Sequence, residues 1–143
     1  MDVVRVLFLC TGNACRSQMA EGWTRALHPR QIEAQSAGIK PSTINPRAVA
    51  VMDEVNIDIT RQGSKSVADL GSAAFDYVIT VCDNAREQCP VLPGNTQHIH
   101  VPFDDPPQLA AEARSEDEAL VHYRRVRDEI RELVEGLPER LGR

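Results

Sequence analysis

The stretch VVRVLFLCTGNACRSQMAEG, residues 3–22, decides the fold of this chain because it joins a buried strand to a helix. Its first part, Val3 to Leu9, is apolar and β-branched apart from Arg5, which predicts a buried strand. The turn-like residues 11–16 follow, and a helix is predicted from Ser17 onward.

Strands and helices continue to alternate along the rest of the chain. Further strands are predicted at 32–37, 76–81 and 98–103, and helices at 46–55, 66–70 and 116–137. Asn45 is a capping residue before Pro46, and Ser115 with Glu118 forms a capping-box pattern. This order predicts a single α/β domain over residues 1–143, with a four-stranded parallel sheet flanked by helices on both faces.

Bulk composition limits the classes of partner. The net charge of −5 argues against a general nucleic-acid or anionic membrane surface. No segment is long enough to span a bilayer, and the short N-terminal apolar run lacks the features of a signal peptide. We therefore expect a cytoplasmic protein. In that compartment its 4 cysteines are catalytic, redox-active or buried rather than bridged.

Cys10 stands where parallel sheets bind ligands, at the carboxyl end of the first strand. Thr11 to Arg16 enters a helix N-terminus, where backbone N–H groups converge on an anion, and Gly12 permits close approach or a positive φ. Arg16 can bind a tetrahedral oxyanion through two hydrogen bonds. The positive electrostatic field of the loop N–H groups and Arg16 favours the thiolate form of Cys10. Ser17 is placed to donate a hydrogen bond to the Cys10 sulfur. The alternative is an ordinary strand-to-helix turn after a buried cysteine.

An acidic pair follows the fourth predicted strand, in Asp104-Asp105-Pro106-Pro107. It lies at the same edge of the sheet, so a carboxylic acid there can protonate a leaving oxygen. A nearby thiolate and a bound anion both favour the protonated acid. The same four residues also favour a turn. The local sequence is therefore compatible with either a catalytic acid or a structural turn.

Cys82 closes the third strand, and Cys89 follows in CDNAREQC, residues 82–89. If the intervening residues are helical, the pair is separated by roughly 10.5 Å. A disulfide requires Cα atoms within about 7 Å, so oxidation would have to unwind that segment. Cys82 can instead be a small buried hydrophobe. The spacing is unusual for zinc, and His98 and His100 suit surface or packing roles better than metal ligation, so we expect no metal.

CTGNACRS, residues 10–17, resembles the active-site loop of low-molecular-weight protein tyrosine phosphatases and of the arsenate reductases that share their fold. The resemblance continues through QSAG (35–38), CDNAREQC and FDDPP (103–107). It implies that Cys10 is the nucleophile and that Asp105, in an Asp-Pro pair, is the general acid, with Asp104 a structural neighbour. The oxyanion would be held by the loop residues Thr11, Gly12, Asn13, Ala14, Cys15 and Arg16, and Asn13, Ser17 and Ser36 would support the loop.

The second cysteine pair resembles that of the thioredoxin-coupled arsenate reductases in this family. In the implied scheme Cys10 attacks arsenate, Cys82 attacks Cys10 to release arsenite, and Cys89 attacks Cys82. Thioredoxin would then reduce the Cys82–Cys89 disulfide, and Arg86 would help Cys82 ionise. We expect a monomer with no tightly bound cofactor. The alternatives are a phosphatase acting on phosphotyrosine or aryl phosphates, and an arsenic-responsive or redox-sensing binding protein.

Two positions depart from the family pattern. Ala14 stands where related reductases often have serine, which should matter little because the cradle is mainly backbone. Some reductases hold potassium through residues matching Asn13, Glu21, Ser36 and a carboxylate, but Lys65 stands at the last position. We expect its ammonium to replace the ion. Cys15, inside the loop, is expected to be a buried packing residue, with a redox role beside Cys10 as the alternative.

Overall fold

The computed structural model describes residues 3–70, 74–83 and 95–142. Its strands pair in parallel in the order β2-β1-β3-β4. The strands are β1 (Val4–Cys10), β2 (Ile32–Gly38), β3 (Tyr77–Thr80) and β4 (Gln97–His100). The predicted parallel sheet is thus confirmed, with Cys10 as the last residue of the central strand β1.

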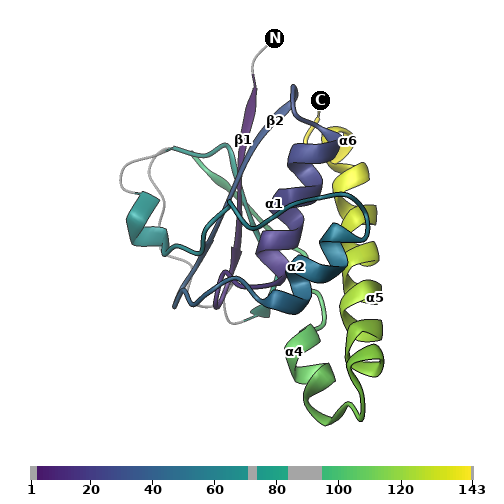
Figure 1. Ribbon diagram of the computed structural model, residues 1–143. Helices are drawn as coiled ribbons and strands as arrows, with labels where there is room; N and C mark the ends of the chain where they lie inside the picture. Colours follow the sequence, from purple (N-terminus) through teal and green to yellow (C-terminus); the bar gives the residue numbers. More distant parts are fainter. Residues whose placement is uncertain (1–2, 71–73, 84–94, 143) are drawn as a thin grey trace.

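The helices pack mainly against one another and against the sheet. They are α1 (Arg16–Leu27), α2 (Pro46–Asp53), η1 (Val67–Leu70), α4 (Pro106–Leu109), η2 (Ala110–Glu112), α5 (Glu116–Glu135) and α6 (Leu137–Arg140). α1, α2 and α5 lie side by side, whereas η1 lies away from them across the strands (Figure 1). Every residue of β1 except Arg5 is buried, so both faces of this strand are covered. No helix in the described ranges has the length and apolar character needed to cross a membrane.

The long C-terminal helix departs from the prediction at both ends. The Ser115 hydroxyl accepts a hydrogen bond from the Glu118 amide at 3.1 Å, as a capping box requires. The Glu118 carboxylate, however, accepts from the Arg114 amide at 3.3 Å, so the reciprocal half of the box is missing. α5 ends before Gly136, and Leu137 continues the buried apolar stripe from the next helix, α6.

The structure defines the type of two short segments. Residues 67–70 form a 3-10 helix rather than an α-helix. The Asp-Asp-Pro-Pro segment, for which turn chemistry was one interpretation, opens α4, with Asp105 as its N-cap and Pro106 as its first residue. Proline suits that position because its missing N–H would have no partner in the first helical turn.

Parallel strand order brings three chain segments together at one edge of the sheet. The Val81 amide donates to Leu9 at 3.0 Å, and the Phe103 amide donates to Val81 at 3.1 Å. The residues that follow β1, β3 and β4 are therefore neighbours in space. This edge carries Cys10, Cys82 and Asp105.

A substitution at Gly22 tests how closely α1 packs against the core. A Cβ added there would lie 2.8 Å from the Ile59 Cγ2 methyl. We expect Gly22→Ala to lower the free energy of unfolding by about 1–3 kcal/mol because the core has no room for the methyl group. Urea unfolding followed by circular dichroism measures this. Gly136→Ala is the control, since its nearest atoms would be 3.9 Å away; equal midpoints for both variants would contradict the prediction.

Candidate active site

The loop between β1 and α1 turns its carbonyl groups outward. Amides of the following segment donate to them: Ile39 to Cys10 at 3.1 Å, Lys40 to Thr11 at 2.8 Å, Ser42 to Gly12 at 2.9 Å and Asn45 to Ala14 at 2.8 Å. In a trans peptide the next N–H points opposite to the carbonyl, so the amides of Gly12, Asn13 and Cys15 point away from that segment, toward the inside of the loop. Within the described residues these amides meet no protein acceptor. The loop is therefore an anion cradle built from backbone.

Asn13 gives the loop its shape. Its φ of 48° lies in the left-handed region, which a short polar side chain tolerates. Its Oδ1 accepts from the Lys65 amide at 2.9 Å, and its carbonyl accepts from Gln18 Nε2 at 2.9 Å. Gly12, by contrast, does not have a positive φ, and a Cβ there would meet no protein atom closer than Ser42 Oγ at 3.4 Å. Asn13, not Gly12, supplies the unusual backbone conformation.

Gly38, which the sequence indicated only as the last residue of QSAG, lies against the loop. A Cβ at this position would lie 2.7 Å from the Thr11 carbonyl oxygen and 2.8 Å from the Asn13 nitrogen. Only glycine lets β2 pass so close to the back of the loop. The signal was present in QSAG, because its glycine follows a strand that ends beside Cys10.

Cys10 and the loop residues line a small pocket. The pocket has a volume of about 180 Å³ and is lined by Cys10, Thr11, Gly12, Ala14, Cys15, Arg16, Asp105 and Pro107. Ser17 Oγ is 2.9 Å from Cys10 Sγ and accepts a hydrogen bond from Asn13 Nδ2 at 2.9 Å. The Asn13 side chain thus fixes the position of Ser17 Oγ, which shares a hydrogen bond with the Cys10 sulfur.

Arg16 and Asp105 meet at the mouth of the same pocket. One terminal nitrogen of Arg16 donates to the Phe103 carbonyl at 2.9 Å, and the other is 3.7 Å from Asp105 Oδ1. The Asp105 side chain is 38% exposed, so it can exchange protons with water. Asp104 instead pairs with Arg125 on α5 at 3.0 Å and does not line the pocket.

The remaining described thiols differ in their surroundings. Burial raises the pKa of the Cys15 thiol far above its ordinary value, and the Cys10 charge adds to this, so Cys15 stays protonated. Cys82 is buried, and its sulfur lies 3.3 Å from Thr11 Oγ1 in the loop. Cys89 and Arg86 lie outside the described residues.

Ser36 and Glu21 form a buried pair beneath the loop. Ser36 Oγ donates to Glu21 Oε1 at 2.6 Å, and Arg25 Nε lies 2.8 Å from Glu21 Oε2. The Lys65 ammonium reaches the Gln62 and Gly63 carbonyls at 3.5 Å instead. Our expectation that Lys65 supplies the positive charge at this place was wrong: that charge comes from Arg25, one helical turn along α1 from Glu21. No group of three or more metal-ligating side chains occurs within the described ranges.

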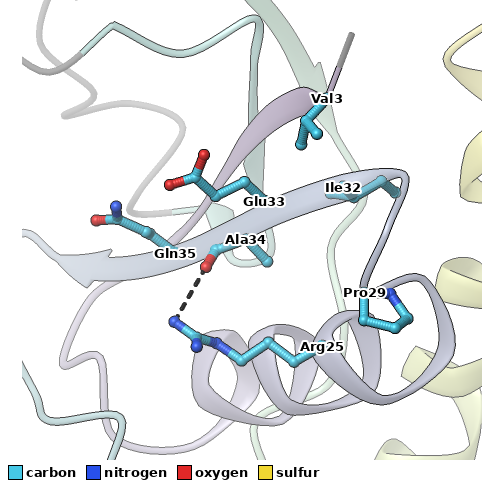
Figure 2. A pocket seen from close by; sticks show the side chains of 7 residues that line it. All are labelled: Val3, Arg25, Pro29, Ile32, Glu33, Ala34 and Gln35. Carbon is cyan, nitrogen blue, oxygen red and sulfur yellow. Dashed lines mark hydrogen bonds between the residues drawn. The ribbon is translucent and has the colours of Figure 1, made fainter. Parts of the chain in front are cut away.

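A larger hollow of about 540 Å³ lies along β2, lined by Val3, Arg25, Pro29, Ile32, Glu33, Ala34 and Gln35. Figure 2 shows Arg25 donating to the Ala34 carbonyl across it, at 3.3 Å. It shares no lining residue with the pocket at Cys10 and contains no thiol. The reactive groups therefore belong to the smaller pocket.

The fold and the loop place this chain among α/β proteins that hold a tetrahedral oxyanion beside a cysteine thiol. Residues 5–143 match the family described as low molecular weight phosphotyrosine protein phosphatase, and the chain belongs to that family.

Similar proteins within this family are described as arsenate reductases. The arsenate reductase of Halalkalibacterium halodurans is 42% identical over 134 residues, which cover 94% of both chains. A solved arsenate reductase in the phosphate binding state matches with a TM-score of 0.73 and 30% identity, covering 96% of this chain and 98% of that one. Another, in the intermediate state, matches with a TM-score of 0.76 and 31% identity, covering 98% and 100%.

Gly38→Ala tests whether the cradle depends on the close approach of β2. The added methyl group must displace the backbone of Thr11 or Asn13, so we expect phosphate to bind at least about tenfold more weakly, the loss of one charge-assisted hydrogen bond. Isothermal titration with inorganic phosphate measures this. Wild-type affinity in a folded Gly38→Ala variant would show that the loop does not need glycine there.

Proposed function

We propose that this protein is an arsenate reductase that binds arsenate at Cys10 and reduces it to arsenite with its own thiols. The observation that carries the proposal is the contact of Cys82 with Thr11 at 3.3 Å. Hydrolysis of a phosphate ester needs one thiol, whereas reduction of an oxyanion needs a second thiol close to the first. The names of the similar proteins support the same function.

In the first proposed step, the Cys10 thiolate attacks pentavalent arsenic. A sulfur–arsenic bond forms, and an arsenic–oxygen bond breaks as Asp105 gives its proton to the departing oxygen, which leaves as water. The loop amides and Arg16 hold the remaining oxygens. The position of Asp105 within reach of Arg16, at the pocket mouth, supports this assignment.

In the second proposed step, the Cys82 thiolate attacks the Cys10 sulfur. The sulfur–arsenic bond breaks and its electron pair stays on arsenic, which leaves as trivalent arsenite. A Cys10–Cys82 disulfide remains, so the two thiols have supplied the electrons. The Thr11 hydroxyl, beside the Cys82 sulfur, supports this order because it holds the second thiol at the loop.

In the last proposed steps, a partner protein reduces the disulfide and restores the free thiols. We propose that Cys89 attacks Cys82 and frees Cys10, and that the dithiol of thioredoxin then reduces the Cys82–Cys89 bond to two thiols. This cycle suits a monomer in the reducing cytoplasm, with no other cofactor. Cys89 lies outside the described residues, so its part in the relay rests on the resemblance of CDNAREQC to the family.

Phosphatase activity is the second candidate function, because the family includes phosphotyrosine phosphatases. None of the described residues that line the pocket is aromatic. An aromatic wall is the usual means of stacking a phosphotyrosine ring, so this pocket favours a small inorganic oxyanion. We propose that hydrolysis of aryl phosphates is at most a side activity of the same Cys10.

The deciding assay is arsenate-dependent consumption of NADPH with thioredoxin and thioredoxin reductase. We expect steady consumption that requires all components. If activity required glutaredoxin and glutathione instead, the proposed reduction of arsenate would stand, but the reducing partner would be glutaredoxin rather than thioredoxin. Stoichiometric binding of arsenite without turnover would instead identify a binding protein and reject the proposal.

Cys82→Ser separates reduction from hydrolysis. We expect it to abolish multiple-turnover arsenate reduction, because no thiol is left to release arsenite from Cys10. Its hydrolysis of p-nitrophenyl phosphate should stay within about twofold of wild type, since Cys82 takes no part in that reaction. Normal arsenate turnover by this variant would exclude the relay.

The response to potassium tests the charge beside Glu21. Because Arg25 already pairs with Glu21, we expect kcat/KM for arsenate to change by less than about twofold between potassium and sodium chloride at equal ionic strength. Lys65→Ala should behave in the same way, since the ammonium does not contact Glu21. A several-fold rise with potassium in the wild-type protein would contradict this account.

A further inference from the structure

His100 bridges the two residues on either side of the Val81-Cys82 step. Its Nδ1 lies 2.7 Å from Thr80 Oγ1, and its Nε2 lies 2.8 Å from Asp83 Oδ1. Thr80 ends β3, opposite His100 at the end of β4, and Asp83 directly follows Cys82. One imidazole ring therefore contacts the chain both before and after the buried thiol.

The backbone around Cys82 shows why this bridge matters. Val81 is fixed by the sheet, since its amide donates to Leu9 and its carbonyl accepts from Phe103. Within the described residues, neither Cys82 nor Asp83 makes a further backbone hydrogen bond to the sheet. The Asp83 side chain is 80% exposed, and within the described ranges its one hydrogen bond is to His100. Within the described residues, His100 is therefore the contact that ties Asp83 to the sheet.

We propose that His100 is a positioning residue for Cys82: by holding Thr80 and Asp83 together, it keeps the Cys82 sulfur against the Thr11 hydroxyl. This inference rests on the proposed function, because the sulfur position matters for attack on Cys10. Thiolate attack requires alignment with the bond that breaks, and a displacement of about 1 Å can cost on the order of a hundredfold in rate.

The bridge suits a ring in either charge state. A neutral ring protonated at Nε2 donates to Asp83 and accepts from the Thr80 hydroxyl. An imidazolium donates to both, and the Thr80 hydroxyl then turns to the Ile99 carbonyl at 3.5 Å. Thr80 and Asp83 thus remain bridged whether or not the imidazole carries a charge.

The test compares His100→Ala with His98→Ala, the exposed histidine on the same strand. We expect His100→Ala to slow single-turnover formation of the Cys10–Cys82 disulfide after addition of arsenate by about tenfold or more. Its affinity for phosphate should stay within about twofold of wild type, because the Cys10 cradle does not use His100. His98→Ala should change neither quantity.

Two further variants show whether the bridge itself is responsible. Asp83→Ala removes one end of it and should reproduce most of the loss. His100→Gln retains an N–H donor for Asp83 and should recover part of the rate, which also covers the case in which His100→Ala does not fold. A general structural role predicts a different result, namely parallel losses of thermal stability, phosphate affinity and rate; that result, or full activity in His100→Ala, would overturn the proposal.

A second measurement does not depend on arsenate. Alkylation of the wild-type and His100→Ala proteins by iodoacetamide, followed peptide by peptide with mass spectrometry, reports the reactivity of each thiol. We expect the rate at Cys82 to change severalfold and the rate at Cys10 to stay the same. If the wild-type protein does not reduce arsenate, the proposed function fails, but this measurement still decides the role of His100. Unchanged reactivity at Cys82 would reject it.

Discussion

The structure depends on the outward hydrogen bonding of the loop carbonyls to residues 39–45. Because these carbonyls are satisfied on the outside, the loop amides point inward and form the anion cradle. Asn45 links this arrangement to the helices. Its amide donates to Ala14, its Oδ1 caps α2 at the Arg47 amide, and its Nδ2 donates to the Tyr123 hydroxyl of α5 at 3.0 Å. Burial raises the pKa of Tyr123, so its hydroxyl stays protonated.

The buried face of α1 is unusually polar for a core helix. Ser17, Gln18, Glu21 and Thr24 are all buried, and each has a hydrogen bond or an ion pair. Burying polar groups contributes little stability, but directional contacts from each of these side chains restrict how the helix can lie against the loop. The polar face therefore fixes the geometry of the cradle, while the apolar packing of β1 and α5 supplies most of the stabilisation.

The side chains proposed to take part in the reaction lie at one edge of the sheet. Parallel pairing places the residues after β1, β3 and β4 side by side, so Thr11 meets Cys82 and Arg16 meets Asp105. Each group is attached to a different strand end, and the sheet itself sets the spacing. His100, at the end of β4, extends the same principle because it reaches across to β3 and to the residue after Cys82.

The sequence by itself determined the strand, loop and helix around Cys10, the parallel fold and the caps at Asn45 and Ser115. These features depend on periodicity and hydrogen bonds within a few residues, so a local pattern is enough to predict them. It did not reveal that β2 passes so close to the loop that Gly38 must be glycine, or that Arg25 rather than Lys65 pairs with Glu21. It placed Cys82 at a strand end near the loop, but not in contact with Thr11, 71 positions away. Only the tertiary structure decided these contacts, because they depend on which strand ends become neighbours and how closely their backbones approach.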